Sequence, residues 1–237
     1  MLEIEHVSGG YRPGVTVVHG IDFAVDSGHA VGLIGRNGAG KTCLAQTLLG
    51  VLPAHGGSIR LDGTDLTRMR PRERIRHRLA LVPEGRMVFP QLSVRENLEM
   101  AAFGAGLRLT VDRLRRVEDI FPLLARKAQS RAGAMSGGEQ QWLALGRALV
   151  QEPKAIVLDE PSLGLSPVAI ADLAESLLRI RQQGVALVLM EQNPHLLQRL
   201  CDTVLLLDQG QVSSSVDLST EDGGRLVGAA YLGTTAD

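Results

Sequence analysis

The chain has 237 residues, of which 44% are hydrophobic, so it is long enough to bury the core of one domain. Its formal net charge of −1 gives no overall field that would attract nucleic acid. Only two cysteines occur, Cys43 and Cys201, without metal-type spacing, and no stretch approaches the roughly 20 apolar residues that span a bilayer. We therefore expect a cytoplasmic protein with no nucleic-acid partner.

The predicted elements begin with extended segments separated by glycine-rich turns at 2–7, 16–25 and 58–61, which indicate an antiparallel β layer. Short apolar runs that alternate with helical patterns predict buried strands of a mainly parallel sheet. These runs lie at 30–34, 79–82, 155–158, 185–190 and 203–207.

A complete phosphate-loop sequence, GRNGAGKT, follows the first of these strands and precedes a helical pattern. Its glycines allow backbone N–H groups to surround phosphates, and the helix N-terminus adds a partial positive charge. Lys41 would contact the phosphates, and the Thr42 hydroxyl would coordinate Mg²⁺. The candidate nucleotide-binding residues here are Gly35, Arg36, Asn37, Gly38, Ala39, Gly40, Lys41, Thr42 and Cys43.

Arginines occupy every second position from Arg68 to Arg78. Pro71 predicts that a helix begins there, and alternate positions spread around a helix instead of forming one face. A solvated surface helix is the favoured interpretation. The alternative is a cationic patch that faces anionic lipid head groups.

A mostly helical insertion is predicted between about Ser93 and Ser130, where the β-branched runs stop. Ser93 and Glu96 form a capping box that opens its first helix. Pro122 would bend or end the first helix. An apolar stripe that we expect to face the core consists of Leu114, Val117, Phe121 and Leu124.

Two further motifs follow. Ser136, Gly137 and Gly138 precede an apolar helical stretch and make a second anion-binding helix terminus, although a plain N-cap would look the same. The strand at 155–158 ends in Asp159 and Glu160. Asp159 would hold Mg²⁺ and Glu160 would polarise an attacking water. The alternative is that the two acidic residues only form an N-cap and turn before Pro161.

These three motifs, in this order and spacing, resemble the ABC ATPase family over essentially the entire chain. The resemblance implies a P-loop α/β fold of the ABC type that binds ATP and Mg²⁺ and hydrolyses ATP. It implies one nucleotide-binding domain, 1–237, with a RecA-like core and antiparallel layer at 1–87 and 136–237 and a helical subdomain at 88–135. Tyr11 matches the adenine-stacking aromatic of the family.

The resemblance also implies a dimer with a second, identical or paralogous ABC ATPase. In that family the signature loop of one chain completes the ATP site of the other. The corresponding residues here are Ser136, Gly137, Gly138, Glu139 and Gln140.

Three positions depart from the family pattern. Glu84 stands where most members carry a glutamine that touches Mg²⁺, so the implied metal set is Thr42, Glu84 and Asp159. Gln192 replaces a histidine that contacts the γ-phosphate; an amide can donate that hydrogen bond but cannot gain a proton. Gln192 and Glu160 are thus the candidate catalytic residues. Ser166 replaces an aspartate. His195 is expected inside the helix that Asn193 and Pro194 open.

The strings VPEGR at 82–86, EPSLGL at 160–165 and EQN at 191–193 resemble the smaller ATPase subunit of the branched-chain amino-acid importers. This implies membrane permease subunits, indirectly a solute-binding protein, and a peripheral location on the inner face of the cell membrane. Related urea or amide importers remain an alternative. A nucleotide-gated module acting on DNA or ribosomes is disfavoured by the charge, and a partner that hydrolyses ATP poorly is disfavoured by the intact Glu160.

Overall fold

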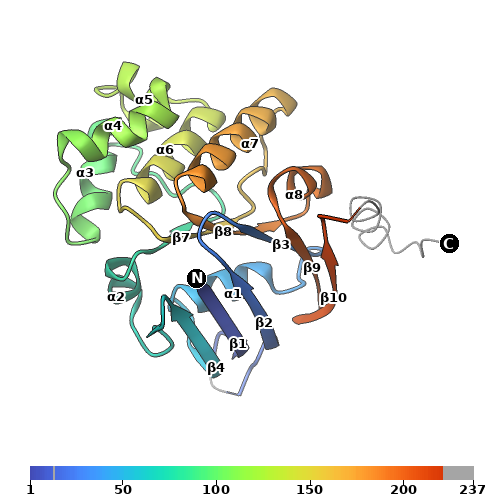
Figure 1. The fold of residues 1–237 in the computed structure, drawn as a ribbon. Helices are drawn as coiled ribbons and strands as arrows, with labels where there is room; N and C mark the ends of the chain where they lie inside the picture. Colours follow the sequence, from blue (N-terminus) through green and yellow to red (C-terminus); the bar gives the residue numbers. More distant parts are fainter. Residues whose placement is uncertain (13, 221–237) are drawn as a thin grey trace.

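The computed structural model describes residues 1–12 and 14–220 and arranges them as two β-sheets with helices packed between and beside them (Figure 1). Residues 221–237 of the predicted domain lie outside the described part. The fold confirms the predicted α/β class with an antiparallel layer and a mainly parallel core sheet.

The smaller sheet is antiparallel, with the strand order β2-β1-β4-β5. Leu2, Ile4 and Val7 of β1 are buried, with a register shift between Ile4 and Val7, so one face of this sheet packs on the interior. The predicted segments at 16–25 and 58–61 correspond to strands that start at Val18 and Ala54. The strands are β1 Leu2–Gly9, β2 Val18–Val25, β4 Ala54–Leu61 and β5 Thr64–Asp65.

The larger sheet has six strands in the order β10-β9-β3-β8-β7-β6. Its strands from β9 to β6 are parallel, and β10 pairs antiparallel to β9 at the edge. β10 was not predicted, because its run of serines is exposed and lacks an apolar pattern. The strands are β3 Ala30–Ile34, β6 Leu79–Val82, β7 Ala155–Asp159, β8 Ala186–Glu191, β9 Thr203–Asp208 and β10 Gln211–Asp217.

Helix α1 contacts both sheets, whereas α3 to α6 gather beside the larger sheet (Figure 1). The capping box of Ser93 and Glu96 opens α3 as predicted. Pro122 does not end this first helix, which stops at Gly104; it follows the end of α4 and begins α5, because proline suits the first turn of a helix. Val117 and Phe121 are buried, and the Phe121 ring stacks on Trp142 of α6 at 6.0 Å between centroids. The helices are α1 Lys41–Leu48, α2 Pro71–Arg76, α3 Val94–Gly104, α4 Val111–Ile120, α5 Pro122–Arg126, α6 Gly137–Leu149, α7 Pro167–Gln182 and α8 Pro194–Leu200.

The arginine run forms neither a uniform solvated helix nor a uniform cationic patch, because Arg74 is only 1% exposed. Its guanidinium donates to the carbonyl oxygens of Thr47 at 2.7 Å, Leu48 at 2.6 Å, Thr67 at 2.7 Å and Met69 at 3.0 Å. Two of these carbonyls end α1, the helix that the phosphate loop opens. Arg74 therefore ties α2 to the C-terminus of α1, and burial lowers its pKa to about 10.

We expect Arg74→Met to destabilise the protein by at least about 3 kcal/mol, because it leaves several buried carbonyls without a donor. The melting temperature should fall by roughly 6–12 °C, measured by calorimetry. Arg72→Met is the matched control, since Arg72 is exposed on the same helix. Equal melting temperatures for the two variants would contradict the anchoring role of Arg74.

Candidate functional site

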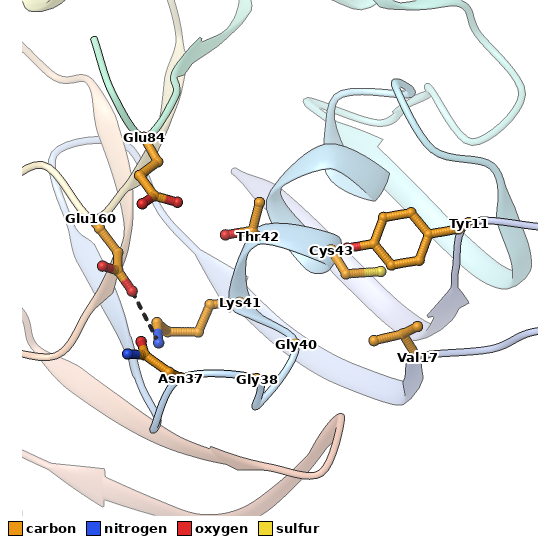
Figure 2. Close-up of a pocket in the computed structure, with 10 residues that line it drawn as sticks. All are labelled: Tyr11, Val17, Asn37, Gly38, Gly40, Lys41, Thr42, Cys43, Glu84 and Glu160. Atoms are coloured by element: carbon orange, nitrogen blue, oxygen red, sulfur yellow. Dashed lines mark ion pairs between the residues drawn. The ribbon is translucent and has the colours of Figure 1, made fainter.

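The predicted site loops meet at one edge of the larger sheet, because β3, β8, β7 and β6 are parallel neighbours. The loop at the carboxyl end of each strand therefore opens on the same side. A cleft of about 300 Å³ lies there (Figure 2). It is lined by Tyr11, Val17, Asn37, Gly38, Gly40, Lys41, Thr42, Cys43, Glu84 and Glu160.

The floor of the cleft is the phosphate loop, whose shape depends on two glycines. Gly38 and Gly40 have φ angles of 84° and 106°, in the left-handed region that favours glycine. Gly40 is the N-cap of α1 and provides no side-chain cap, so the first N–H groups of the helix stay open to a ligand. A Cβ at Gly40 would also lie 3.0 Å from Val18. This geometry suits an anion at the helix N-terminus.

Lys41 supplies the positive charge of the cleft and is already engaged. Its Nζ donates to the carbonyl oxygens of Gly35 at 2.7 Å and Arg36 at 3.3 Å. It also lies 3.2 Å from Oε1 of Glu160, and the two side chains are only 4% and 10% exposed (Figure 2). The charge of the Lys41 ammonium is therefore balanced by the carboxylate of Glu160, the predicted catalytic residue.

Glu160 is fixed by further contacts. Its φ of 47° places a non-glycine residue in the left-handed region, directly after β7. Gln192 Nε2 donates to Glu160 Oε1 at 2.7 Å and to Asn37 Oδ1 at 2.9 Å. The structure thus joins the two residues predicted from the sequence as catalytic. His195 lies in the first turn of α8 and does not line the cleft, as predicted.

The donor set fits a divalent cation beside the phosphate loop. Oδ1 of Asp159 is buried and makes no hydrogen bond within the described residues, so an acceptor lacks a partner there. The Thr42 side chain hydrogen bonds with the same carboxyl group, and Glu84 lines the cleft from the loop after β6. No group of three His, Cys, Asp or Glu side chains in the described chain could hold a metal by itself. Oxygens of a bound phosphate would have to complete the shell.

The buried Asp159 carboxylate lowers the stability of the fold. Burial raises its pKa from 3.8 to about 6, and the carboxylates of Glu84 and Glu160 add to the rise, while Thr42 and Lys41 oppose it. A raised pKa means that the folded protein binds the proton more tightly than the unfolded chain. Ionisation therefore opposes folding increasingly from pH 3.8 to about 6, and fully above that.

We accordingly expect Asp159→Asn to stabilise the nucleotide-free protein at pH 7.5, by on the order of 2 kcal/mol. The gain should shrink as the pH falls to 4.5, where wild-type Asp159 carries a proton most of the time. Thermal unfolding across this pH range measures it. A variant that is less stable than the wild type at pH 7.5 would contradict the assignment.

The opposite end of the cleft is apolar (Figure 2). Tyr11 is 60% exposed and faces the cleft together with Val17, a residue that sequence reasoning missed because it belongs to no motif. The Cys43 thiol is 2% exposed, and burial raises its pKa. Cys43 therefore stays neutral and forms part of the wall. A flat aromatic ligand would fit against Tyr11.

The second predicted anion-binding terminus lies away from this cleft. Ser136 is the N-cap of α6, and its capping box with Glu139 is complete. Lys127 pairs with Glu139 at 2.5 Å, and Gln140 Nε2 donates to the carbonyl of Ala132. None of Ser136, Gly137, Gly138, Glu139 and Gln140 lines the cleft. Their role across a dimer stays a prediction.

Comparison with known proteins gives a consistent family. The ABC transporter family model matches residues 18–163. The chain is 42% identical over 212 residues to the high-affinity branched-chain amino acid transport ATP-binding protein BraG of Pseudomonas aeruginosa, covering 90% of this chain and 91% of the relative. It is 31% identical to the probable branched-chain amino acid transport ATP-binding protein LivF of Archaeoglobus fulgidus, with 90% of both chains covered.

Proteins named for export are also similar. The Nod factor export ATP-binding protein I of Paraburkholderia xenovorans is 35% identical, with 89% of this chain and 68% of that protein covered. Among solved structures, an ATP-binding subunit of an ABC transporter superposes with a TM-score of 0.81 at 31% identity, covering 92% of this chain and 90% of the other. No helix in the described part of the chain is long and apolar enough to cross a membrane.

Proposed function

The chain belongs to the ABC transporter family of ATP-binding subunits, and we propose that it powers a membrane importer for branched-chain, hydrophobic amino acids. Its activity is ATP hydrolysis coupled to transport. The observation that carries the enzymatic part is the pairing of Lys41 with Glu160 in one cleft, with the buried Asp159 carboxyl group close enough for both charges to act on its pKa. The similarity to BraG and the strings at 82–86, 160–165 and 191–193 support the choice of solute.

In the proposed reaction the Lys41 ammonium leaves the Glu160 carboxylate and contacts the γ-phosphate of ATP instead. Glu160, freed from the ammonium but still held by Gln192, then accepts the proton of the attacking water. Thr42, Asp159 and Glu84 would hold Mg²⁺, which neutralises charge on the β- and γ-phosphates when bound. Gln192 orients Glu160 without itself taking a proton.

The exposed start of α6 supports the proposed dimer. Ser136 is exposed at a helix N-terminus that does not face the cleft of its own chain. We infer that a second ATPase chain, identical or paralogous, brings its phosphate loop to this terminus and that each cleft is completed in this way.

We further propose that permease subunits hold this protein at the inner face of the membrane and that a solute-binding protein delivers the amino acid. Purification of the tagged protein from native membranes should recover two permease subunits, and deletion of its gene should abolish high-affinity leucine uptake. Unchanged leucine uptake with loss of urea or amide uptake would contradict the proposed solute. Loss of an exported product would contradict the proposed direction.

A further inference from the structure

Glu191, the last residue of β8, places a carboxylate in the protein interior directly behind the cleft. Its side chain is 2% exposed. None of the ion pairs within residues 1–12 and 14–220 includes it. A buried carboxylate without a cation destabilises a fold unless hydrogen bonds satisfy both of its oxygens.

Both oxygens of Glu191 accept such bonds, and their donors come from two different loops. Oε1 accepts from the backbone N–H of Ser162 at 2.8 Å. Oε2 accepts from the backbone N–H of Gln192 at 3.1 Å and of Asn193 at 3.4 Å. Burial raises the pKa of Glu191 above its ordinary value, and the hydrogen bonds from Ser162, Gln192 and Asn193 offset part of that rise by stabilising the carboxylate.

The two loops held by this carboxylate carry the two candidate catalytic side chains. Ser162 lies in the turn that follows Glu160. In this turn the backbone N–H of Leu163 donates to the carbonyl oxygen of Glu160 at 3.1 Å. The other loop begins with Gln192, whose amide donates to Glu160 at 2.7 Å. One buried carboxylate therefore binds the backbone of both loops, in addition to the bond from the Glu160 N–H to the Met190 carbonyl at 2.8 Å.

We propose that Glu191 is a positioning residue for ATP hydrolysis: its ionised carboxylate holds the Glu160 loop and the Gln192 loop in register, so that Gln192 keeps Glu160 aimed at the attacking water. This inference rests on the proposed role of Glu160. Glu191 itself does not line the cleft, and the donors to its carboxylate, Ser162, Gln192 and Asn193, all lie outside the phosphate loop.

The test uses the complete complex with its permease subunits. Glu191→Gln keeps the shape of the side chain. An ionised carboxylate accepts hydrogen bonds at both oxygens, but the amide replaces one oxygen by an NH₂ group, which cannot accept from the backbone N–H groups that face it. We expect kcat for ATP hydrolysis to fall about 10- to 100-fold, while the Kd for ATP stays within about twofold of the wild type. Glu175→Gln, on the exposed face of α7, is the matched control and should change neither.

A purely structural role would weaken ATP binding and lower the melting temperature together with kcat, and this outcome would overturn the proposal. So would an unchanged kcat. If Glu191→Gln does not fold, Glu191→Asp, which retains the charge and withdraws it by one methylene, takes its place with the same expected split.

A double-mutant cycle that combines Glu191→Gln with Gln192→Ala tests whether Glu191 affects kcat through Gln192. If Glu191 acts through Gln192, the double variant should lose no more activity than the slower single variant; losses that multiply would overturn the proposal. Glu160→Gln distinguishes a failure of the positioning role of Glu191 from a failure of the catalytic role of Glu160. If that variant stalls while Glu191→Gln turns over normally, only the positioning role fails; if Glu160→Gln turns over normally, the catalytic assignment fails as well.

Discussion

Glu160→Gln is expected to bind ATP but to slow its hydrolysis by about 10²- to 10⁴-fold. The substituted amide keeps an oxygen that can accept from Gln192 and Lys41, so the local geometry should persist. It cannot take a proton from water. Single-turnover hydrolysis by the assembled complex measures the effect, and ATP-dependent dimers should accumulate in size-exclusion chromatography.

Glu175→Gln is the control for Glu160→Gln, since Glu175 is an exposed carboxylate that pairs with Arg199 on the surface. It should hydrolyse ATP at the wild-type rate. A Glu160→Gln variant that turned over within twofold of the wild type would exclude Glu160 as the general base.

Lys41→Ala should weaken ATP binding at least about 100-fold, corresponding to roughly 3 kcal/mol. Two effects combine: the phosphates lose a charge-assisted donor, and Glu160 keeps its negative charge beside the phosphate site without the ammonium that balances it. Equilibrium binding of a fluorescent ATP analogue gives the affinity.

Lys154→Ala is the matched substitution for Lys41→Ala, because Lys154 pairs with Asp62 on the surface and its loss should cost less than about 1 kcal/mol. ATP affinity should remain at the wild-type level in this control. Equal affinities for the two variants would show that the phosphate loop binds nucleotide through its backbone alone.

The site could be predicted from the sequence where a motif with functional residues directly follows a strand. GRNGAGKT after β3 and the acid pair after β7 are local patterns, and a parallel sheet brings such loops together without further information. The strands β3, β7 and β8 were predicted from their apolar runs, which are buried on both faces of the sheet.

Contacts that depend on side-chain geometry could not be predicted in this way. Glu191 belongs to the EQN string, but nothing in the string shows that its carboxylate turns inward toward Ser162. Arg74 is one of six alternating arginines, and only the packing of α2 on α1 distinguishes it from its exposed neighbours. Val17 contributes an apolar surface without any motif.

The Lys41–Glu160 contact has a consequence for the anions that can bind in the cleft. Because the ammonium is already neutralised, free inorganic phosphate or sulfate gains little by displacing the carboxylate. A ligand must add contacts elsewhere in the cleft, such as the Tyr11 end, to make the exchange favourable. We therefore expect small anions to bind in this cleft more weakly than the complete nucleotide.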